Sequence, residues 1–176
     1  MKSRNIPNAL GLILIGFGVI ILSPIFVAVI EKEYSSILPF MVASLCSIVL
    51  GVVLKWKGGW INNFDNIKRT DGLLIVSLTW VVTGIIGAIP YIFYGIGPLD
   101  AYFESISGLT TTGATILTDF SLYPKDFFFW RSLSQWLGGM GIIVLFIAIL
   151  PQFAVAGRKI FFAEAPGPTE EKITPR

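Results

Sequence analysis

The sequence has no histidine and a single cysteine, Cys46, which lies inside an apolar run. These shortages exclude a disulfide framework, a zinc cluster of Cys and His ligands, and a Cys–His nucleophile. Charge is scarce as well, since 14% of the 176 residues are charged and the formal net charge is +2. The Lys and Arg residues are spread along the chain and form no basic face, so nucleic acid is not an expected partner.

Apolar residues are what the chain has in excess. Hydrophobic types make up 54% of it, and four runs carry almost no charge, at residues 6–30, 37–54, 72–94 and 127–150. A helix needs about 20 such residues to cross the ~30 Å hydrocarbon core of a bilayer. We therefore predict an all-α membrane protein with four transmembrane helices in contact with the lipid bilayer.

The first two runs form an N-terminal helix pair within region 1–57. Pro24 is expected to kink or end the first span near its far end, because proline cannot continue the ladder of helical hydrogen bonds. Residues 58–71 are mostly polar, and we predict that they form a loop, on the cytoplasmic side because of its Lys and Arg residues. Asp71, at the end of this loop, is a candidate N-cap for the third span.

Orientation follows from the positive charges, because loops rich in Lys and Arg stay on the cytoplasmic side. With four crossings, ten of the 13 Lys and Arg residues fall on one side and three on the other. Both termini are therefore predicted to be cytoplasmic, in a multi-pass protein of the cell inner (plasma) membrane, and region 152–176 is a cytoplasmic connection. The ten are Lys2, Arg4, Lys55, Lys57, Lys68, Arg69, Arg158, Lys159, Lys172 and Arg176, and the three are Lys32, Lys125 and Arg131.

Aromatic and small residues indicate the ends and contact faces of these helices. Trp56 and Trp60 follow the second span and Trp130 begins the fourth, as expected of anchors at a membrane interface. Gly84 and Ala88 lie four residues apart on the third span, which permits close approach of a neighbouring helix. Glycine is also simply tolerated in membrane helices, so this contact is one of two interpretations.

A shorter helix is predicted between the third and fourth spans. Residues 100–107 are mainly apolar, follow Pro98 and begin with Asp100, and Gly108 can close the helix in the left-handed conformation. Eight residues reach about 12 Å, so this helix can enter a bilayer but cannot cross it. We predict a re-entrant pore helix at 100–107.

The polar segment that follows, residues 110–113, is predicted to be extended. Non-helical backbone at membrane depth is tolerated only where protein surrounds it or water fills a cavity. An extended segment exposes carbonyl oxygens, which in rings replace the hydration shell of a potassium ion, and the negative end of the short helix dipole adds to the attraction. The residues alone leave three interpretations open: a cation filter, an ordinary external hairpin, and the substrate loop of a secondary transporter.

Three ordered motifs resemble a known family. They are the run 101–115 (AYFESISGLTTTGAT), the run 130–151, and the run 163–168 with the closing residues 174–176. Together with the two preceding spans they cover essentially the whole chain. In these residues the chain resembles the Trk/Ktr/HKT superfamily of potassium transporters, and within it the bacterial Trk proteins.

The resemblance implies four helix, pore-loop, helix units around one potassium pathway, with region 72–151 as the first unit. It implies potassium uptake by selective permeation, with the potassium ion as transported substrate and no organic cofactor in this chain. Carbonyls of Thr110, Thr111, Thr112 and Gly113 would form one quarter of the filter, with Thr111 and Thr112 the first choices for ion contact. No tyrosine follows Gly113, where tetrameric potassium channels place one, so strict exclusion of sodium is not implied.

Residues around the filter have two interpretations each. Glu104 either raises the local cation concentration or supports the filter by hydrogen bonds, and we expect support, together with Gly108. Arg131 either reaches the headgroups or pairs with Asp126 or Glu104. Three glycines of the fourth span either pack against the pore helix or form a hinge for gating. They are Gly138, Gly139 and Gly141.

One pore loop cannot enclose an ion, so further subunits or domains are expected as partners. The other three pore-loop units either lie on the same longer polypeptide, of which this chain is the N-terminal portion, or come from a homotetramer. The resemblance also implies a cytosolic regulatory subunit that binds nucleotide. An alternative from another class is a non-transporting membrane scaffold or interaction protein with a threonine-rich external loop. An enzyme is not expected, because the apolar segments lack a paired acid and base.

Overall fold

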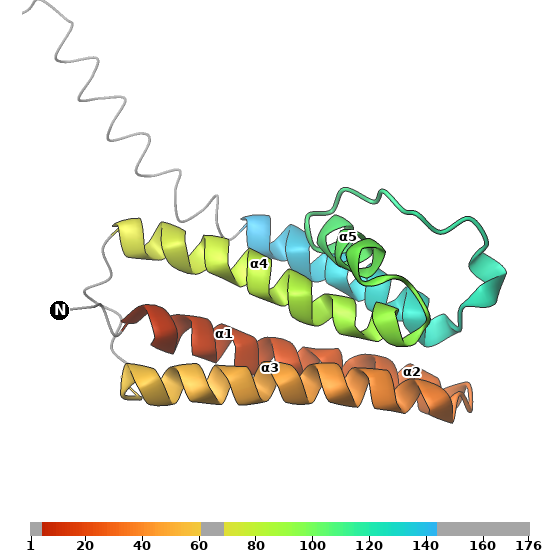
Figure 1. Cartoon of the computed structure of the whole chain (residues 1–176), viewed down its shortest axis with the longest axis horizontal. Coiled ribbons are helices and arrows are strands. Elements are labelled where there is room, and N and C mark those ends of the chain that lie inside the picture. The colour runs from red at the N-terminus through yellow and green to blue at the C-terminus, as the bar shows by residue number, and fades with distance from the viewer. Residues whose placement is uncertain (1–4, 61–68, 144–176) are drawn as a thin grey trace, which may run out of the picture. The chain divides into compact units, whose positions relative to one another are not determined.

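The computed structural model describes residues 5–60 and 69–143, and within them every regular element is helical. This confirms the predicted all-α class for the described part of the chain. The elements in order are α1 (Asn5–Ile21), α2 (Ser23–Ile30), the 3-10 helix η1 (Tyr34–Ser36), α3 (Ile37–Gly58), α4 (Arg69–Phe93), α5 (Pro98–Leu109) and the 3-10 helix η2 (Phe120–Leu122) (Figure 1). Residues 125–143 form a further helix.

Three helical stretches of the described chain are long and apolar enough to cross a membrane. They are Asn5–Ile30, Tyr34–Gly58 and Thr70–Phe93, and they overlap the first three predicted spans. The helix at 125–143 covers part of the fourth predicted span, whereas residues 144–150 lie outside the described residues. Most of the predicted loop at 58–71 and all of the predicted connection at 152–176 also lie outside them.

The first span is broken near its far end, between α1 and α2. Pro24 lies in the first turn of α2, and it has no N–H with which to continue the hydrogen bonds of α1. The carbonyl of Ile20, which a residue at this position would normally bind, instead accepts from the Ser23 hydroxyl at 2.8 Å. The expected effect of Pro24 is therefore confirmed, and the broken bond has a local replacement.

The start of α4 differs from the prediction. The helix begins at Arg69, so Asp71 lies inside its first turn and is not an N-cap. A carboxylate in the first turn still faces the positive end of the helix dipole, which is a favourable position. The prediction was wrong because aspartate is favoured both at the N-cap and within the first turn of a helix. The sequence alone does not distinguish these two neighbouring positions.

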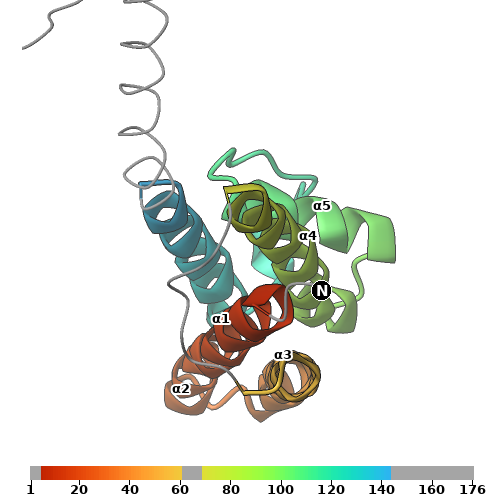
Figure 2. The same cartoon turned by 90° about the vertical axis from the view of Figure 1, so that its left-hand side faces the viewer.

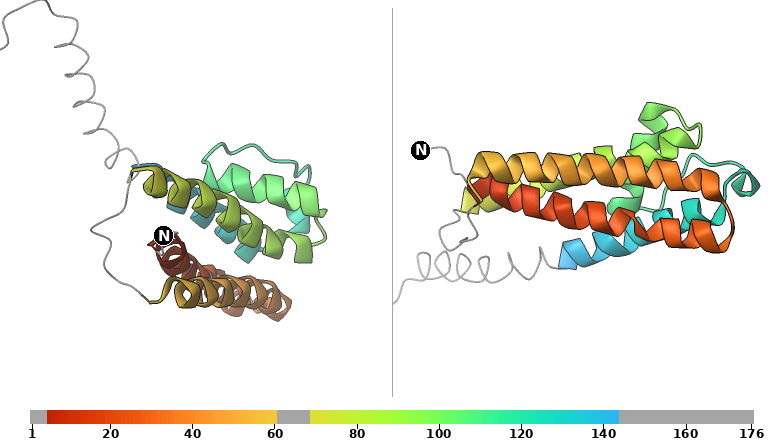
Figure 3. Two further views of the ribbon diagram at one scale, coloured as in Figure 1. Left: turned by 60° about the vertical axis from the view of Figure 1, so that its left-hand side comes forward. Right: turned by 90° about the horizontal axis from the view of Figure 1, so that it is seen from below.

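Helices α1 and α3 lie side by side with their backbones in close contact (Figures 2 and 3). A Cβ atom at Gly11 would lie 2.5 Å from the carbonyl oxygen of Gly51, so no larger residue fits there. The Ser44 hydroxyl donates to Gly18 O at 2.7 Å, and the Ser47 hydroxyl donates to Leu14 O at 2.7 Å. Small residues and hydroxyl groups therefore join these two helices at the level of the backbone.

Helix α5 packs on α4 through a second set of small residues. A Cβ atom at Gly84 would lie 2.3 Å from Ile106 Cδ1, and one at Gly87 would lie 2.6 Å from Ser105 Oγ. Ala88 on the same helix is buried. The predicted close approach at Gly84 thus occurs, and the neighbour is the short helix α5 (Figure 2).

An aromatic cluster joins the N-terminal helices to the rest of the fold. Trp130 lies in it, with its ring centroid 5.9 Å from that of Phe17 and 6.4 Å from that of Phe40, and its Nε1 donates to Gly87 O at 3.2 Å. Only 1% of its surface is exposed, so the prediction of Trp130 as an interfacial anchor is wrong. Trp56 and Trp60, by contrast, are exposed. Trp130 differs because it lies one turn inside its helix, on the side facing α1 and α3.

Candidate functional site

The candidate site begins with α5, which is longer than predicted. Pro98 follows Gly97 at the start of the helix, Asp100 lies in the first turn, and the helix runs for 12 residues to Leu109. Both Pro98 and Asp100 are favoured at these positions, because proline needs no N–H partner there and a carboxylate faces the positive end of the dipole. Twelve residues extend about 18 Å, which is still short of the ~30 Å hydrocarbon core.

Thr111 closes α5, and the prediction of Gly108 in this role is wrong. Thr110 is the C-cap, and Thr111 follows with a φ of 58°, in the left-handed region. Its N–H donates to Gly108 O at 3.0 Å, and the Thr112 N–H donates to Ser107 O at 3.0 Å, which together form a Schellman motif. The backbone at residues 110 and 111 is therefore a turn, whereas an extended segment was predicted over 110–113.

Glycines bring the helix at 125–143 against the end of α5. A Cβ atom at Gly108 would lie 2.4 Å from Ser134 Oγ, and one at Gly138 would lie 1.7 Å from the carbonyl oxygen of Leu109. At Gly139 the nearest atom would be the Thr111 methyl, at 3.7 Å. Gly108 thus has a packing role inside the helix, and Gly138 permits the contact that fixes where α5 ends. The role of Gly141 stays a prediction.

The loop after α5 is held by its hydroxyl groups and by one glycine. The Ser107 hydroxyl donates to Ala114 O at 2.6 Å, and the hydroxyl oxygens of Thr110 and Thr112 lie 2.8 Å apart. Gly113 has a φ of 74°, a conformation that L-residues other than glycine rarely adopt. Glycine at 113 therefore lets the chain turn away from the helix end without the strain that a side chain would add.

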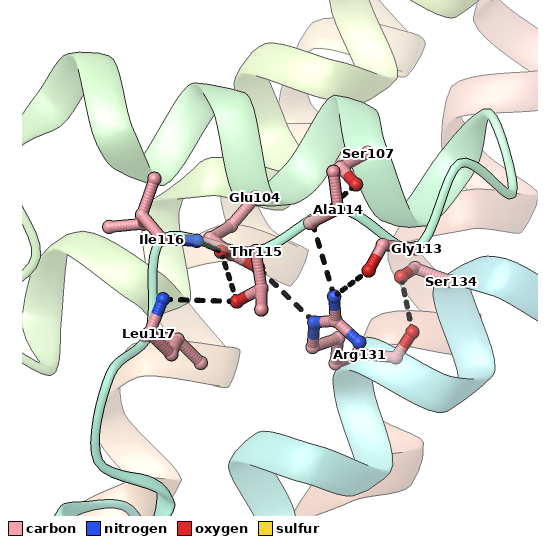
Figure 4. Close-up of polar contacts among 9 residues, drawn as sticks. All are labelled: Glu104, Ser107, Gly113, Ala114, Thr115, Ile116, Leu117, Arg131 and Ser134. Carbon is pink, nitrogen blue, oxygen red and sulfur yellow. Dashed lines mark hydrogen bonds and ion pairs between the residues drawn. The ribbon is translucent and has the colours of Figure 1, made fainter.

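Glu104 connects this loop to α5 from behind (Figure 4). Its side chain is fully buried, and one carboxylate oxygen accepts from the Thr115 hydroxyl at 2.6 Å and from the Ile116 N–H at 2.7 Å. The other oxygen accepts from Arg131 Nε at 3.1 Å. A buried carboxylate with three donors is well compensated, and its bonds fix two residues of the returning loop.

Arg131 binds both Glu104 and the loop itself (Figure 4). Of the two partners considered for it, the structure has Glu104. Its Nη2 donates to Gly113 O at 3.2 Å and to Ala114 O at 3.3 Å. The side chain is 17% exposed, so the guanidinium is largely enclosed by the residues that it binds.

The backbone carbonyls of the loop fall into two groups. In the described part of the chain, no hydrogen bond ends on the carbonyl oxygens of Thr110, Thr111 or Thr112, and all three residues are exposed. The carbonyls of Gly113 and Ala114 are engaged by Arg131. Three consecutive carbonyls without an internal donor in the described residues therefore follow the C-terminal end of α5, where the helix dipole is negative.

A second polar contact lies at the other end of the helix at 125–143, and sequence reasoning missed it. Asp126 is fully buried, and one of its carboxylate oxygens accepts from the Tyr94 hydroxyl. Its neighbour Lys125 pairs with Glu31 at 2.9 Å near the end of α2. Asp126 and Tyr94 are 32 residues apart, and no local pattern in the sequence indicates that they pair.

Comparison with known proteins identifies relatives along nearly the whole chain. The TrkH family model, described as "Cation transport protein", matches residues 13–175. The chain is 39% identical to the Trk system potassium uptake protein TrkH of Vibrio parahaemolyticus and 40% identical to that of Escherichia coli, with 100% of this chain covered in both cases. It is 31% identical to the Trk system potassium uptake protein TrkG of Escherichia coli over 98% of this chain.

A solved structure agrees with the sequence relatives. The crystal structure of the potassium transporter TrkH from Vibrio parahaemolyticus matches 93% of this chain with a TM-score of 0.78 and 34% sequence identity. That match covers 37% of the solved chain, and the sequence matches cover 36% and 37% of the two TrkH relatives. The chain therefore spans a little over a third of the length of the relatives that it matches.

Proposed function

Because the chain belongs to the TrkH family of cation transport proteins, we propose that it is part of a potassium uptake protein and supplies one of four pore loops. The transported substrate is the potassium ion, which moves by selective permeation without covalent chemistry. The observation that carries this proposal is the row of three unpaired carbonyls at Thr110, Thr111 and Thr112, at the C-terminal end of α5. Thr111 and Thr112 are the first choices for ion contact.

The proposed topology has four transmembrane helices and one re-entrant helix. The three apolar stretches and the helix that includes residues 125–143 cross the membrane, and α5 enters without crossing. The distribution of Lys and Arg supports cytoplasmic termini in the plasma membrane. In this arrangement the loop at 110–113 begins near the membrane midplane and runs back toward the outside.

Gly113 belongs to the filter through its backbone conformation. Its φ of 74° turns the chain directly after the three free carbonyls. Glu104 and Gly108 support the filter, since Glu104 binds the returning loop and Gly108 lets the helix at 125–143 approach. The three remaining pore loops come from the same longer polypeptide or from further copies, and a cytosolic nucleotide-binding subunit regulates the assembly.

The proposal is tested with the complete protein in cells that lack their own potassium uptake. Wild type is expected to restore growth at low potassium, and Gly113→Asp is expected to abolish this rescue without loss of protein from the membrane. Gly95→Asp is a matched control, because Gly95 has a φ of 88° and, like Gly113, has no atom within 4 Å of an added Cβ. Both variants carry similar backbone strain, about 1–2 kcal/mol, but only Gly113 borders the free carbonyls.

Three results decide the matter. Rescue by wild type and by Gly95→Asp but not by Gly113→Asp supports the filter. Normal rescue by Gly113→Asp refutes the filter assignment. Absence of rubidium flux in liposomes that contain the complete wild-type protein refutes transport and favours a membrane scaffold.

A further inference from the structure

Arg131 binds two backbone carbonyls of the loop in addition to Glu104. Its ion pair with Glu104 does not by itself require these two contacts. One nitrogen, Nε, donates to Glu104, while another, Nη2, reaches the carbonyls of Gly113 and Ala114 at 3.2 and 3.3 Å. The guanidinium is planar and presents its donors in a fixed fork, so all three contacts constrain each other. Figure 4 shows this side chain joined by dashed lines to the Glu104 carboxylate and to the loop backbone.

Two neighbouring carbonyls can meet one donor only if the backbone between them departs from the extended form. Along an extended chain, successive carbonyls point to opposite sides. Arg131 Nη2 donates to both the Gly113 and the Ala114 carbonyl, and the φ of 74° at Gly113 lies between the Thr112 carbonyl and these two. The Ser107 hydroxyl donates to Ala114 O as well, from the opposite helix α5.

The preceding carbonyls are left without such donors. Those of Thr110, Thr111 and Thr112 accept no hydrogen bond in the described part of the chain. A cation at Gly113 O would lie close to the guanidinium, and like charges repel each other strongly where water is scarce. The contacts of Arg131 therefore divide the loop into an open part and a part closed to cations.

We propose that Arg131 is a positioning residue that sets the outer limit of the ion-binding carbonyls in this quarter of the filter, after Thr112. This inference rests on the proposed function, because it assumes that the free carbonyls face a potassium ion. By fixing Gly113 and Ala114, Arg131 fixes the spacing of the carbonyls before them. That spacing decides how well the loop replaces the hydration shell of potassium compared with that of sodium.

The test uses Arg131→Lys in the complete transporter. Lysine keeps the positive charge beside Glu104, but it lacks the planar fork in which Nε binds the carboxylate while Nη2 binds the two carbonyls. We expect the ratio of potassium to sodium transport to fall by about tenfold, a factor that corresponds to about 1.4 kcal/mol. Lys125→Gln is the control, since it removes another positive charge of the same helix, from an exposed ion pair with Glu31, and is expected to keep the wild-type ratio.

A second variant covers the case in which Arg131→Lys does not reach the membrane. Glu104→Gln combined with Arg131→Gln keeps a neutral hydrogen-bonding pair but removes the fork to the loop, and its ratio is also expected to fall. All ratios are measured at equal amounts of membrane protein, because a purely structural loss lowers both ion fluxes equally. A wild-type ratio in either variant overturns the role of Arg131 while leaving the proposed function intact. Absence of potassium transport by the wild type would instead overturn the proposed function.

Discussion

Gly138 offers a direct test of how the end of α5 is placed. A Cβ atom at this position would lie 1.7 Å from the carbonyl oxygen of Leu109 and 2.6 Å from its carbonyl carbon. Real Cβ atoms essentially never approach such an atom within 3.0 Å, so the substitution Gly138→Ala requires a displacement of roughly 1.3 Å. The obstacle is backbone, which cannot rotate away as a side chain would.

The size of the effect follows from two opposing contributions. Alanine in place of glycine favours a helix by about 1 kcal/mol. Overpacking costs about 1–3 kcal/mol and more when backbone must shift. With a backbone obstacle at this distance the cost lies at or above the upper end, so we expect Gly138→Ala to destabilise the protein by about 2 kcal/mol in net terms.

The assay compares Gly138→Ala with Gly16→Ala in the complete protein in detergent. Gly16 also lies in a helix, but nothing lies within 4 Å of an added Cβ there. Heating followed by size-exclusion chromatography gives the temperature at which half of the protein is lost. Gly16→Ala is expected to match or exceed wild type, and Gly138→Ala is expected to fall several degrees below both. Equal midpoints for the two variants would refute the close contact between Leu109 and Gly138.

Two further predictions use the same thermal assay. Thr111→Gly is expected to raise the thermal midpoint, because a β-branched residue at a φ of 58° carries about 1–2 kcal/mol of strain that glycine avoids. A lower midpoint than wild type would contradict the left-handed cap. Tyr94→Phe is expected to destabilise the folded protein by about 1.5–3 kcal/mol, because it removes the hydroxyl that binds the buried carboxylate of Asp126. An unchanged midpoint would show that this contact does not stabilise the fold.

The parts of the fold that could be predicted from the sequence are those determined by local pattern. Long runs without charge located three of the candidate membrane helices to within a few residues. Pro24 indicated the break between α1 and α2, because the missing N–H acts on its own helix. Pro98 and Asp100 likewise indicated where α5 begins to within two residues.

The parts that could not be predicted depend on contacts between distant segments. Gly108 is the natural candidate for a left-handed cap, yet packing against Ser134 keeps it inside α5, and the strained position falls to Thr111. Arg131 had two acidic candidates as partners, and only the approach of the helices selects Glu104. In each case the local preference was sound, and a tertiary contact outweighed it.

The contact between α1 and α3 has a consequence for the polar groups of these two apolar helices. The two backbones meet at Gly11 and Gly51. Across the same interface the hydroxyl groups of Ser44 and Ser47 bond to carbonyls of α1, so neither hydroxyl faces outward. The hydroxyl groups of Ser44 and Ser47 are thus satisfied within the pair and need no partner from the later helices. The aromatic rings of Phe17 and Phe40, one from each helix of the pair, form the surface against which Trp130 packs.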